Sequence, residues 1–291
     1  MNQVSKPVSN KIAIVFDFDE TLVPEDSLKV LLRYCQLDAD SFVSDRIKSL
    51  IADGWDKYIA RAYCLVKESQ QRSKNKITQR TLIEVGQKIK LYDGVITMFD
   101  HLREHLQSID PTVSLEFYLI SGSFGDIFRS TPIAKHFKKM WGTELQYGES
   151  GEVEFIKQQM TNTEKTRYLF YISKGIDKEN ERDLVYNYQD LSADDIYIPL
   201  SQVIYIGDGA SDIPCFTVIN QYSGIALGVY SQDRSAEEWE YLKKVNSSQK
   251  ISNLCEANYQ KDSELIQSLS LAIECIAHQI ALRRLNSHKQ N

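Results

Sequence analysis

The chain has 291 residues, enough for one large domain or two small ones with a proper hydrophobic core. Hydrophobic residues make up 42% of it and charged residues 25%, a balance that argues against disorder and against a fibrous repeat. The formal net charge of −6 argues against nucleic acid as the main partner.

The sequence also suggests where the protein works. Its five cysteines are scattered without a CxxC pair, which indicates reduced thiols in a cytosolic protein. The polar first ten residues lack the apolar segment of a secretory signal. We find no apolar run that approaches the ~20 residues needed to cross a bilayer. We therefore expect a cytoplasmic protein without membrane attachment.

The first predicted element is a strand over residues 12–16, Ile-Ala-Ile-Val-Phe, which is apolar enough to be buried on both faces. Asp17, Asp19 and Glu20 follow it directly. Carboxylates at positions i and i+2 repel each other where a strand ends, so a cation should compensate for them.

Residues 28–90 show helical spacing of apolar side chains and no strand pattern, as in Leu28, Leu31 and Leu32. We interpret them as an all-helical cap inserted after the first strand. The catalytic core is then formed by residues 1–27 and 91–291. The cationic cap residues that could meet a substrate are Arg33, Lys57, Arg61 and Arg80.

The rest of the chain alternates helices with apolar strands. A helix is expected through Val95 and Leu106, strands at 115–120, 203–206 and 223–229, and a final helix over 264–285. The final helix carries one apolar stripe, made of Leu265, Leu269, Ile273, Ile276 and Ile280. This order predicts an α/β fold with a doubly wound parallel sheet. Residues 148–155 suggest a turn and a short strand, whereas residues 180–195 give no assignment.

The first acidic cluster suits phosphoryl chemistry. An aspartate can attack phosphorus and form an aspartyl-phosphate, and a second carboxyl group can act as general acid and then as general base. Both nucleophile and substrate are negative, so Mg²⁺ is the expected cofactor. Thr21 could hold one of the two carboxylates, Asp17 or Asp19, by a hydrogen bond. The alternative is an acidic turn that caps a helix.

Two further clusters follow apolar strands. Ser121 and Gly122 begin the sequence SGS, where a hydroxyl group and free N–H groups at a helix N-terminus could bind phosphate. The sequence GDGASD contributes Asp208 as a metal ligand and Asp212 as a residue supporting the metal site. Its glycines, Gly207 among them, would permit a sharp turn. Either cluster alone could be an ordinary turn.

Lys165 lies in the first turn of a helix predicted to end at Gly175. The helix dipole disfavours a cation there, so a use for the lysine is plausible. That use would be to neutralise the carboxylates and the phosphate. Lys157 is a second candidate, and Lys174 suits the end of the helix electrostatically.

Taken together, DFDET, SGS, Lys165 and GDGASD resemble the four motifs of the haloacid dehalogenase (HAD) superfamily of phosphohydrolases. The position of the helical insertion resembles the phosphoserine phosphatase branch. The resemblance implies a Rossmann-like core in which Asp17 is the nucleophile and Asp19 the general acid/base. It implies that Asp17, the main-chain carbonyl of Asp19 and Asp208 hold Mg²⁺. Ser121, Gly122, Thr21 and Lys165 would then bind the phosphoryl group.

The resemblance also has a departure. Phosphoserine phosphatases usually have asparagine where this chain has Ser211, which leaves the reaction class intact but weakens a phosphoserine assignment. An acidic residue that reads the substrate in that branch would be Asp26 or Glu25, and the sequence does not choose between them.

The leading hypothesis is a Mg²⁺-dependent phosphatase acting on a small phosphorylated metabolite. A phosphotransferase or mutase would use the same aspartyl-phosphate, and a non-catalytic phosphate-binding protein could share the fold. We expect no nucleic-acid partner, and the choice between monomer and homodimer stays open.

Overall fold

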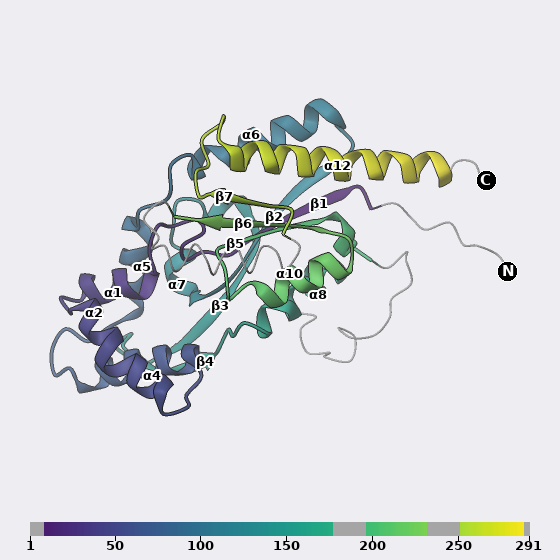
Figure 1. Ribbon diagram of the computed structural model, residues 1–291. Coiled ribbons are helices and arrows are strands. Elements are labelled where there is room, and N and C mark those ends of the chain that lie inside the picture. Colours follow the sequence, from purple (N-terminus) through teal and green to yellow (C-terminus); the bar gives the residue numbers. More distant parts are fainter. Residues whose placement is uncertain (1–8, 177–195, 232–250, 288–291) are drawn as a thin grey trace.

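The computed structural model describes residues 9–176, 196–231 and 251–287 (Figure 1). The polar stretch 180–195, for which the sequence gives no assignment, lies outside the described residues.

Seven strands form one sheet in the order β4-β3-β2-β1-β5-β6-β7. All neighbouring strands are parallel except β3 and β4, which form an antiparallel hairpin at one edge. The strands are β1 (Lys11–Phe16), β2 (Ser114–Phe124), β3 (Phe137–Tyr147), β4 (Val153–Gln158), β5 (Val203–Gly207), β6 (Ile225–Tyr230) and β7 (Asn253–Glu256).

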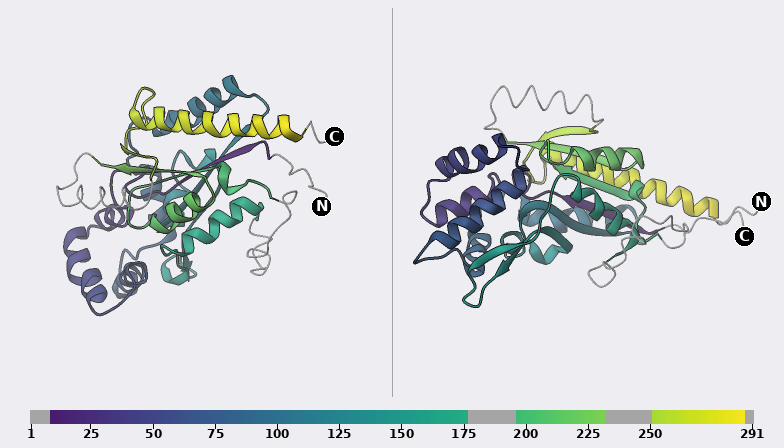
Figure 2. Two further views of the ribbon diagram at one scale, coloured as in Figure 1. Left: turned by 45° about the vertical axis from the view of Figure 1, so that its right-hand side comes forward. Right: turned by 90° about the horizontal axis from the view of Figure 1, so that it is seen from below.

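The central strand β1 is covered on both faces. Ile12 and Ile14 pack in one hydrophobic cluster, while the intervening Ala13 packs in a second cluster on the opposite face. Because side chains alternate along a strand, a run without polar residues is what two covered faces require. Helices α6 (Val95–Ile109) and α12 (Glu264–Ser287) lie side by side on one face of the sheet (Figures 1 and 2).

Helices α8 (Glu164–Lys174) and α10 (Ile213–Gln221) cover the opposite face. Helices therefore flank a mostly parallel sheet on both sides, and the predicted α/β fold class is confirmed.

Residues 28–90, all of which the structure describes, contain helices but no strand of the sheet. The elements of this segment are α1 (Ser27–Tyr34), α2 (Ala39–Ser41), η1 (Phe42–Ile47), α3 (Lys48–Ala52), α4 (Lys57–Gln71) and α5 (Gln79–Lys88). We call them the cap helices. They gather at one end of the molecule, where the β3–β4 hairpin reaches them (Figure 1). Main-chain hydrogen bonds from Gln79 N to Gly151 O (2.8 Å) and from Val153 N to Ile77 O (2.9 Å) join them to that hairpin. The division into core and cap domains at residues 27 and 91 stays a prediction.

The sequence analysis did not find β3 and β7. Strand β3 lies next to the edge of the sheet and carries a mixed pattern that includes the exposed Lys138 and Lys139. Strand β7 has only four residues at the other edge. A strand with exposed charged residues, or a very short strand, lacks the apolar run that made β1 recognisable.

The final helix is as predicted, and its five stripe residues are buried against α6 and the sheet. By length and composition, however, residues Glu264–Asn286 could also cross a membrane, contrary to our expectation that no segment could. A single helix of this kind is weak evidence for a membrane span, because core helices of soluble proteins pass the same test. The apolar stripe of α12 packs against α6 and the sheet, although only 44% of this segment is buried.

The remaining short elements are α7 (Gly125–Phe128) and the 3-10 turns η2 (Ala134–His136) and η5 (Leu200–Gln202).

Candidate active site

Three carboxylates converge where two neighbouring strands end. Asp17 follows β1 and Asp208 follows β5, and Asp17 N donates a hydrogen bond to Ile206 O at 2.9 Å. Asp17, Asp208 and Asp212 each offer an oxygen atom, and these atoms lie within 4.8 Å of one another. The carboxyl ends of adjacent parallel strands meet at one edge of the sheet, which is why distant motifs come together here.

Lys165 joins two of these carboxylates. Its Nζ lies 2.9 Å from Asp17 Oδ2 and 2.8 Å from Asp212 Oδ1, and the side chain is 1% exposed. As predicted, Lys165 is in the first turn of α8, which ends at Gly175 in a left-handed conformation (φ 66°). A cation at this unfavourable end of a helix is thus compensated by two carboxylates.

Burial and charge pairing set the protonation of this cluster. Burial raises the pKa of Asp17 to about 6, although the ammonium group of Lys165 opposes the shift. Burial also works against the charged form of Lys165, but the carboxylates of Asp17 and Asp212 outweigh it and hold the pKa of the lysine well above its usual value. The lysine therefore stays charged inside the core.

Asp212 is completely buried and held from several sides. Its Oδ1 accepts hydrogen bonds from Lys165 and from Tyr205 Oη (2.6 Å), and its Oδ2 accepts one from Ser211 Oγ (3.1 Å). Both oxygens are engaged by protein groups, which fits the supporting role that we predicted. Ser211, the departure from the phosphoserine phosphatase pattern, thus contacts the supporting carboxylate.

Gly207 is needed for close approach and not for the sharp turn that we expected. It ends β5, and its φ is not in the positive range. A Cβ atom there would lie 2.4 Å from both Cγ and Oδ2 of Asp212. The carboxylate of Asp212 can fold back over the strand only because residue 207 has no side chain.

Gly207→Ala should lower the free energy of unfolding by roughly 1–3 kcal/mol, the usual cost of overpacking a tight site. Urea denaturation followed by circular dichroism measures it. Gly148→Ala is the matched control, because the atoms nearest its added Cβ are the movable carboxylate ends of Glu152 and Glu154. An unchanged denaturation midpoint for Gly207→Ala would show that Asp212 is not pressed against the strand.

Asp19 sits apart from Lys165 and faces the cap helices. Its Oδ1 accepts a hydrogen bond from Ser27 N (3.0 Å), and its Oδ2 lies 4.0 Å from the guanidinium group of Arg61. Burial and the neighbouring Asp26 carboxylate raise the pKa of Asp19 to about 8, against the effect of Arg61. A carboxyl group in this setting carries a proton at neutral pH.

The structure distinguishes Asp26 from Glu25, the two candidates for an acidic residue that reads the substrate. Asp26 forms a two-bond ion pair with Arg61, one bond at 2.7 Å, and the guanidinium group holds the pKa of Asp26 below its usual range although burial works the other way. Glu25 instead pairs with Arg33 on the surface. Asp26, and not Glu25, therefore lies beside Asp19.

Of the four cationic cap residues, two lie near the acidic site and two lie on the surface. Arg61 reaches the site, and Lys57 lies next to it with Nζ 5.6 Å from the centre of the Tyr58 ring. The side chain of Arg80 pairs with Glu84 and is 87% exposed, so it lies on the surface. Arg33 also lies on the surface. Lys157 is exposed on β4.

The predicted phosphate-binding sequence SGS has a different setting from the one we expected. Ser121, Gly122 and Ser123 all belong to β2, and a helix begins only at Gly125, so the prediction of a helix N-terminus was wrong. The buried Ser121 Oγ accepts a hydrogen bond from Ser123 N at 3.2 Å. Ser123 Oγ in turn contacts Ser27 Oγ of the first cap helix. The strand continues because β2 pairs with β3 again at Phe124 beyond an irregularity in the ladder.

Thr21 does not make the bond that we predicted. Its Oγ1 is buried and has no hydrogen-bond partner within the described part of the chain. Its main-chain oxygen accepts a bond from Tyr259 Oη at 2.8 Å. A buried hydroxyl without a protein partner, next to the acidic cluster in sequence, suits contact with a bound polar group.

Sequence reasoning missed Tyr58 and Ser27. Tyr58 lies in the segment 28–90 that we interpreted as a helical cap, and its ring lies against Gly122 of β2. The carboxylates and Lys165 act on the Tyr58 hydroxyl electrostatically, and burial raises the pKa of Tyr58 to about 12. No periodicity could have shown which element this tyrosine faces.

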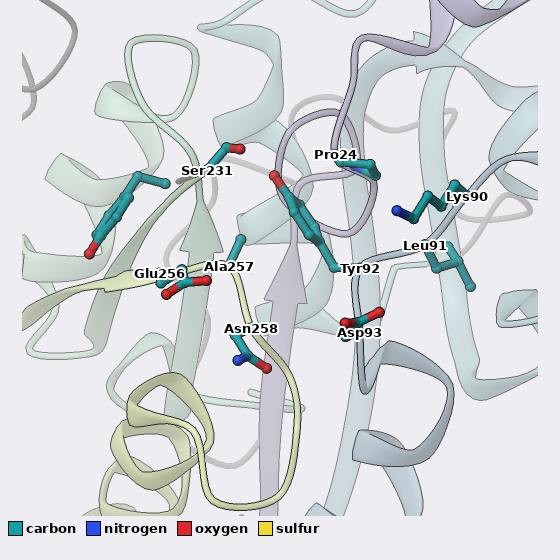
Figure 3. A pocket seen from close by; sticks show the side chains of 10 residues that line it. Pro24, Lys90, Leu91, Tyr92, Asp93, Ser231, Glu256, Ala257 and Asn258 are labelled. Atoms are coloured by element: carbon teal, nitrogen blue, oxygen red, sulfur yellow. The ribbon is translucent and has the colours of Figure 1, made fainter. Parts of the chain in front are cut away.

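A separate cavity of about 230 Å³ lies where the chain crosses between core and cap (Figure 3). It is lined by Pro24, Lys90, Leu91, Tyr92, Asp93, Tyr230, Ser231, Glu256, Ala257 and Asn258. None of the three clustered aspartates is among them, so the cavity is not the acidic site.

The residues of the acidic site fit a magnesium ion. Oxygen atoms of three carboxylates, two of them buried and that of Asp208 half-buried, lie within 4.8 Å of one another. The donors are all oxygen atoms, which hard divalent cations prefer.

Comparison with known proteins identifies the fold. No known family profile matches the chain. An uncharacterised protein of Borreliella burgdorferi is 27% identical over 285 residues, which cover 88% of this chain and 94% of that protein. A HAD-family hydrolase of Salmonella enterica serovar Typhi matches with a TM-score of 0.55 and 15% identity over 84% of this chain and 67% of its own. A phosphoserine phosphatase in its apo form matches with a TM-score of 0.54 and 15% identity over 89% of this chain and 98% of its own.

The chain thus has the fold of the haloacid dehalogenase hydrolases. Among the proteins with this fold, phosphoserine phosphatases match the chain in structure. The resemblance that we predicted from four short motifs is confirmed at the level of the fold.

Proposed function

We propose that this protein is a Mg²⁺-dependent phosphatase that hydrolyses a phosphomonoester of a small metabolite through an aspartyl-phosphate. The observation that carries the proposal is the meeting of Asp17, Asp208 and Asp212 within 4.8 Å, with Lys165 bound to Asp17. Three carboxylates that converge on one point can share a divalent cation, and a cation there would also attract the anionic phosphoryl group.

In the first half of the reaction, a carboxylate oxygen of Asp17 attacks phosphorus and the bond from phosphorus to the ester oxygen breaks. Asp19 gives its proton to the departing oxygen, so that an alcohol leaves and not an alkoxide. The raised pKa of Asp19 supports this assignment, because the group must be protonated before it can donate.

In the second half, Asp19 is a carboxylate and takes a proton from a water molecule. The water oxygen attacks phosphorus, the bond to Asp17 breaks and inorganic phosphate forms. Lys165 and Ser121 would hold the phosphoryl oxygens in both halves. Asp17, Asp208 and the main-chain carbonyl of Asp19 would hold Mg²⁺, which when bound offsets the repulsion between Asp17 and the phosphate.

The test is release of inorganic phosphate from a panel of phosphomonoesters, with and without EDTA. We expect turnover that EDTA abolishes and added Mg²⁺ restores. Product analysis in the presence of a competing alcohol separates hydrolysis from transfer. Failure of every ester to release phosphate above an Asp17→Asn control would refute the proposal.

Mg²⁺ should also stabilise the protein, because it binds the folded state and not the unfolded chain. At an Mg²⁺ concentration ~100 times its dissociation constant, the gain is about 2.7 kcal/mol. Thermal unfolding with and without Mg²⁺ measures the shift in melting temperature. Asp208→Asn should lose most of the shift, whereas the exposed Asp53→Asn should keep it. An equal shift in both variants would exclude Asp208 as a ligand.

We further propose that the protein acts in the cytoplasm on a small phosphorylated metabolite, without a nucleic-acid or membrane partner. The acidic net charge of −6 and the scattered cysteines support this setting. Fractionation of cells expressing the tagged chain tests the location.

A further inference from the structure

We propose that Tyr58 is the closing contact of the cap: its ring seats on Gly122 and shuts the acidic site around the bound ester. The proposal names a positioning residue and rests on the proposed phosphatase function. Neither the motifs nor the comparisons assign a role to Tyr58.

The first step is the contact itself. A Cβ atom added at Gly122 would lie 2.5 Å from Cε1 and 3.0 Å from Cδ1 of Tyr58. Real Cβ atoms essentially never approach other atoms below 3.0 Å. The ring therefore occupies the volume that a side chain at position 122 would need, and glycine is required for the cap to come this close.

The second step is that, on the core side of this contact, a side-chain bond holds the main chain of Gly122. Gly122 O accepts a hydrogen bond from Thr143 Oγ1 at 3.1 Å, which ties the end of β2 to β3. Thr143 Oγ1 itself accepts a bond from Gln159 Nε2 at 2.9 Å. Because this bond and the pairing of Phe124 with Thr143 restrain the end of β2, we expect a larger residue at position 122 to displace the tyrosine and its helix.

The third step is the position of Tyr58 in the cap. It lies in the first turn of α4, whose N-terminus is capped by Asp56: the Asp56 side chain accepts from Tyr58 N at 2.9 Å. One turn later the same helix presents Arg61 to Asp19 and Asp26. Movement of this helix away from β2 would thus withdraw Tyr58 and Arg61 together.

With Tyr58 seated on Gly122, the closed cap would keep water out of the acidic site. Tyr58 is half-buried, and Asp17, Lys165 and Asp212 act on its hydroxyl group electrostatically. The Asp17 side chain is only 6% exposed with the cap in this position. A lid that closes on the ester keeps water out until the alcohol has left. The size of the ring matters for this role, and its hydroxyl group does not.

A double-mutant cycle tests the proposal with Tyr58→Ala, Gly122→Ala and the double variant. Turnover of p-nitrophenyl phosphate is one readout. Hydrogen–deuterium exchange of residues 57–65, without substrate, is the other. We expect each single substitution to speed exchange and to lower kcat/KM by about 10-fold or more. If the clash with Tyr58 is the reason for the glycine, the double variant should be no worse than Tyr58→Ala.

Two further variants sharpen the result. Tyr58→Phe keeps the ring and should retain kcat/KM within about 3-fold, a rescue that mere loss of folding would not show. Ile59→Ala, at a 41% exposed neighbour on the same helix, should match the unaltered protein in both readouts.

If the effects of Tyr58→Ala and Gly122→Ala multiplied in the double variant, the proposal would be overturned. Gly122 would then be required for a reason other than its contact with Tyr58. Unchanged exchange in Tyr58→Ala would also overturn it. If the unaltered protein cleaves no phosphomonoester, the proposed function fails, yet the exchange measurements still decide whether Tyr58 closes the cap.

Discussion

Asp17→Asn should reduce phosphate release by roughly 10⁴-fold or more, the scale expected when a covalent nucleophile is removed. The amide has the same shape as the carboxylate but cannot attack phosphorus. The fold should survive, because burial disfavours the charge on Asp17 and raises its pKa to about 6. Without metal, therefore, the melting temperature of the variant should equal or exceed that of the unaltered protein.

Asp100→Asn is the matched control for this prediction. Asp100 lies on α6 with its side chain 69% exposed, and the same chemical change there should alter neither turnover nor melting temperature. If Asp17→Asn kept a tenth of the activity, Asp17 could not be the nucleophile. Loss of activity together with loss of folding would contradict the claim that the charge is disfavoured by burial.

Lys165→Met should have the largest effect on stability. It removes the partner of two buried carboxylates, and breaking a buried ion pair usually costs about 3–5 kcal/mol. Urea denaturation at pH 7 in EDTA measures the loss. Lys157→Met, on the exposed face of β4, is the control and should change the midpoint little.

The cost of Lys165→Met should depend on pH in a definite direction. Asp17 already has a raised pKa of about 6, and removing the lysine that opposes the shift raises it further. A carboxyl group with a raised folded pKa takes up a proton as the pH falls and is then no longer an unpaired buried charge. The difference between variant and unaltered protein should therefore shrink from pH 7 to pH 5. A difference that grew on acidification would show that the lysine is not held by the carboxylates.

Much of the site could be predicted because the chemistry follows strand ends. Asp17, Asp208 and Asp212 stand after apolar strands, and parallel strands end at one edge, so their meeting required no knowledge of packing. Lys165 could be singled out because it lies at the wrong end of a helix for its charge. These inferences use only local pattern and the direction of strands.

The residues that were not placed correctly from the sequence share one cause: their position depends on contacts between separate elements. Glu25 and Asp26 are adjacent in sequence, and only the placement of Arg61 on α4 decides which of them lies at the site. Tyr58 fits an apolar helical stripe equally well whether it faces other cap helices or Gly122. Ser121 was placed at a helix start because the chain looked like a turn, whereas pairing with β3 keeps it in a strand.

The order of apolar runs and acidic clusters was enough to predict an α/β sheet, its central strand and the carboxylates at its edge, because burial on both faces and strand direction leave their pattern in local sequence. Which cap residues reach those carboxylates was decided only by the folded chain. Contacts such as Tyr58 with Gly122 and Arg61 with Asp26 depend on how separate elements pack, and packing distances of a few ångströms have no signature in the spacing of residues along one helix.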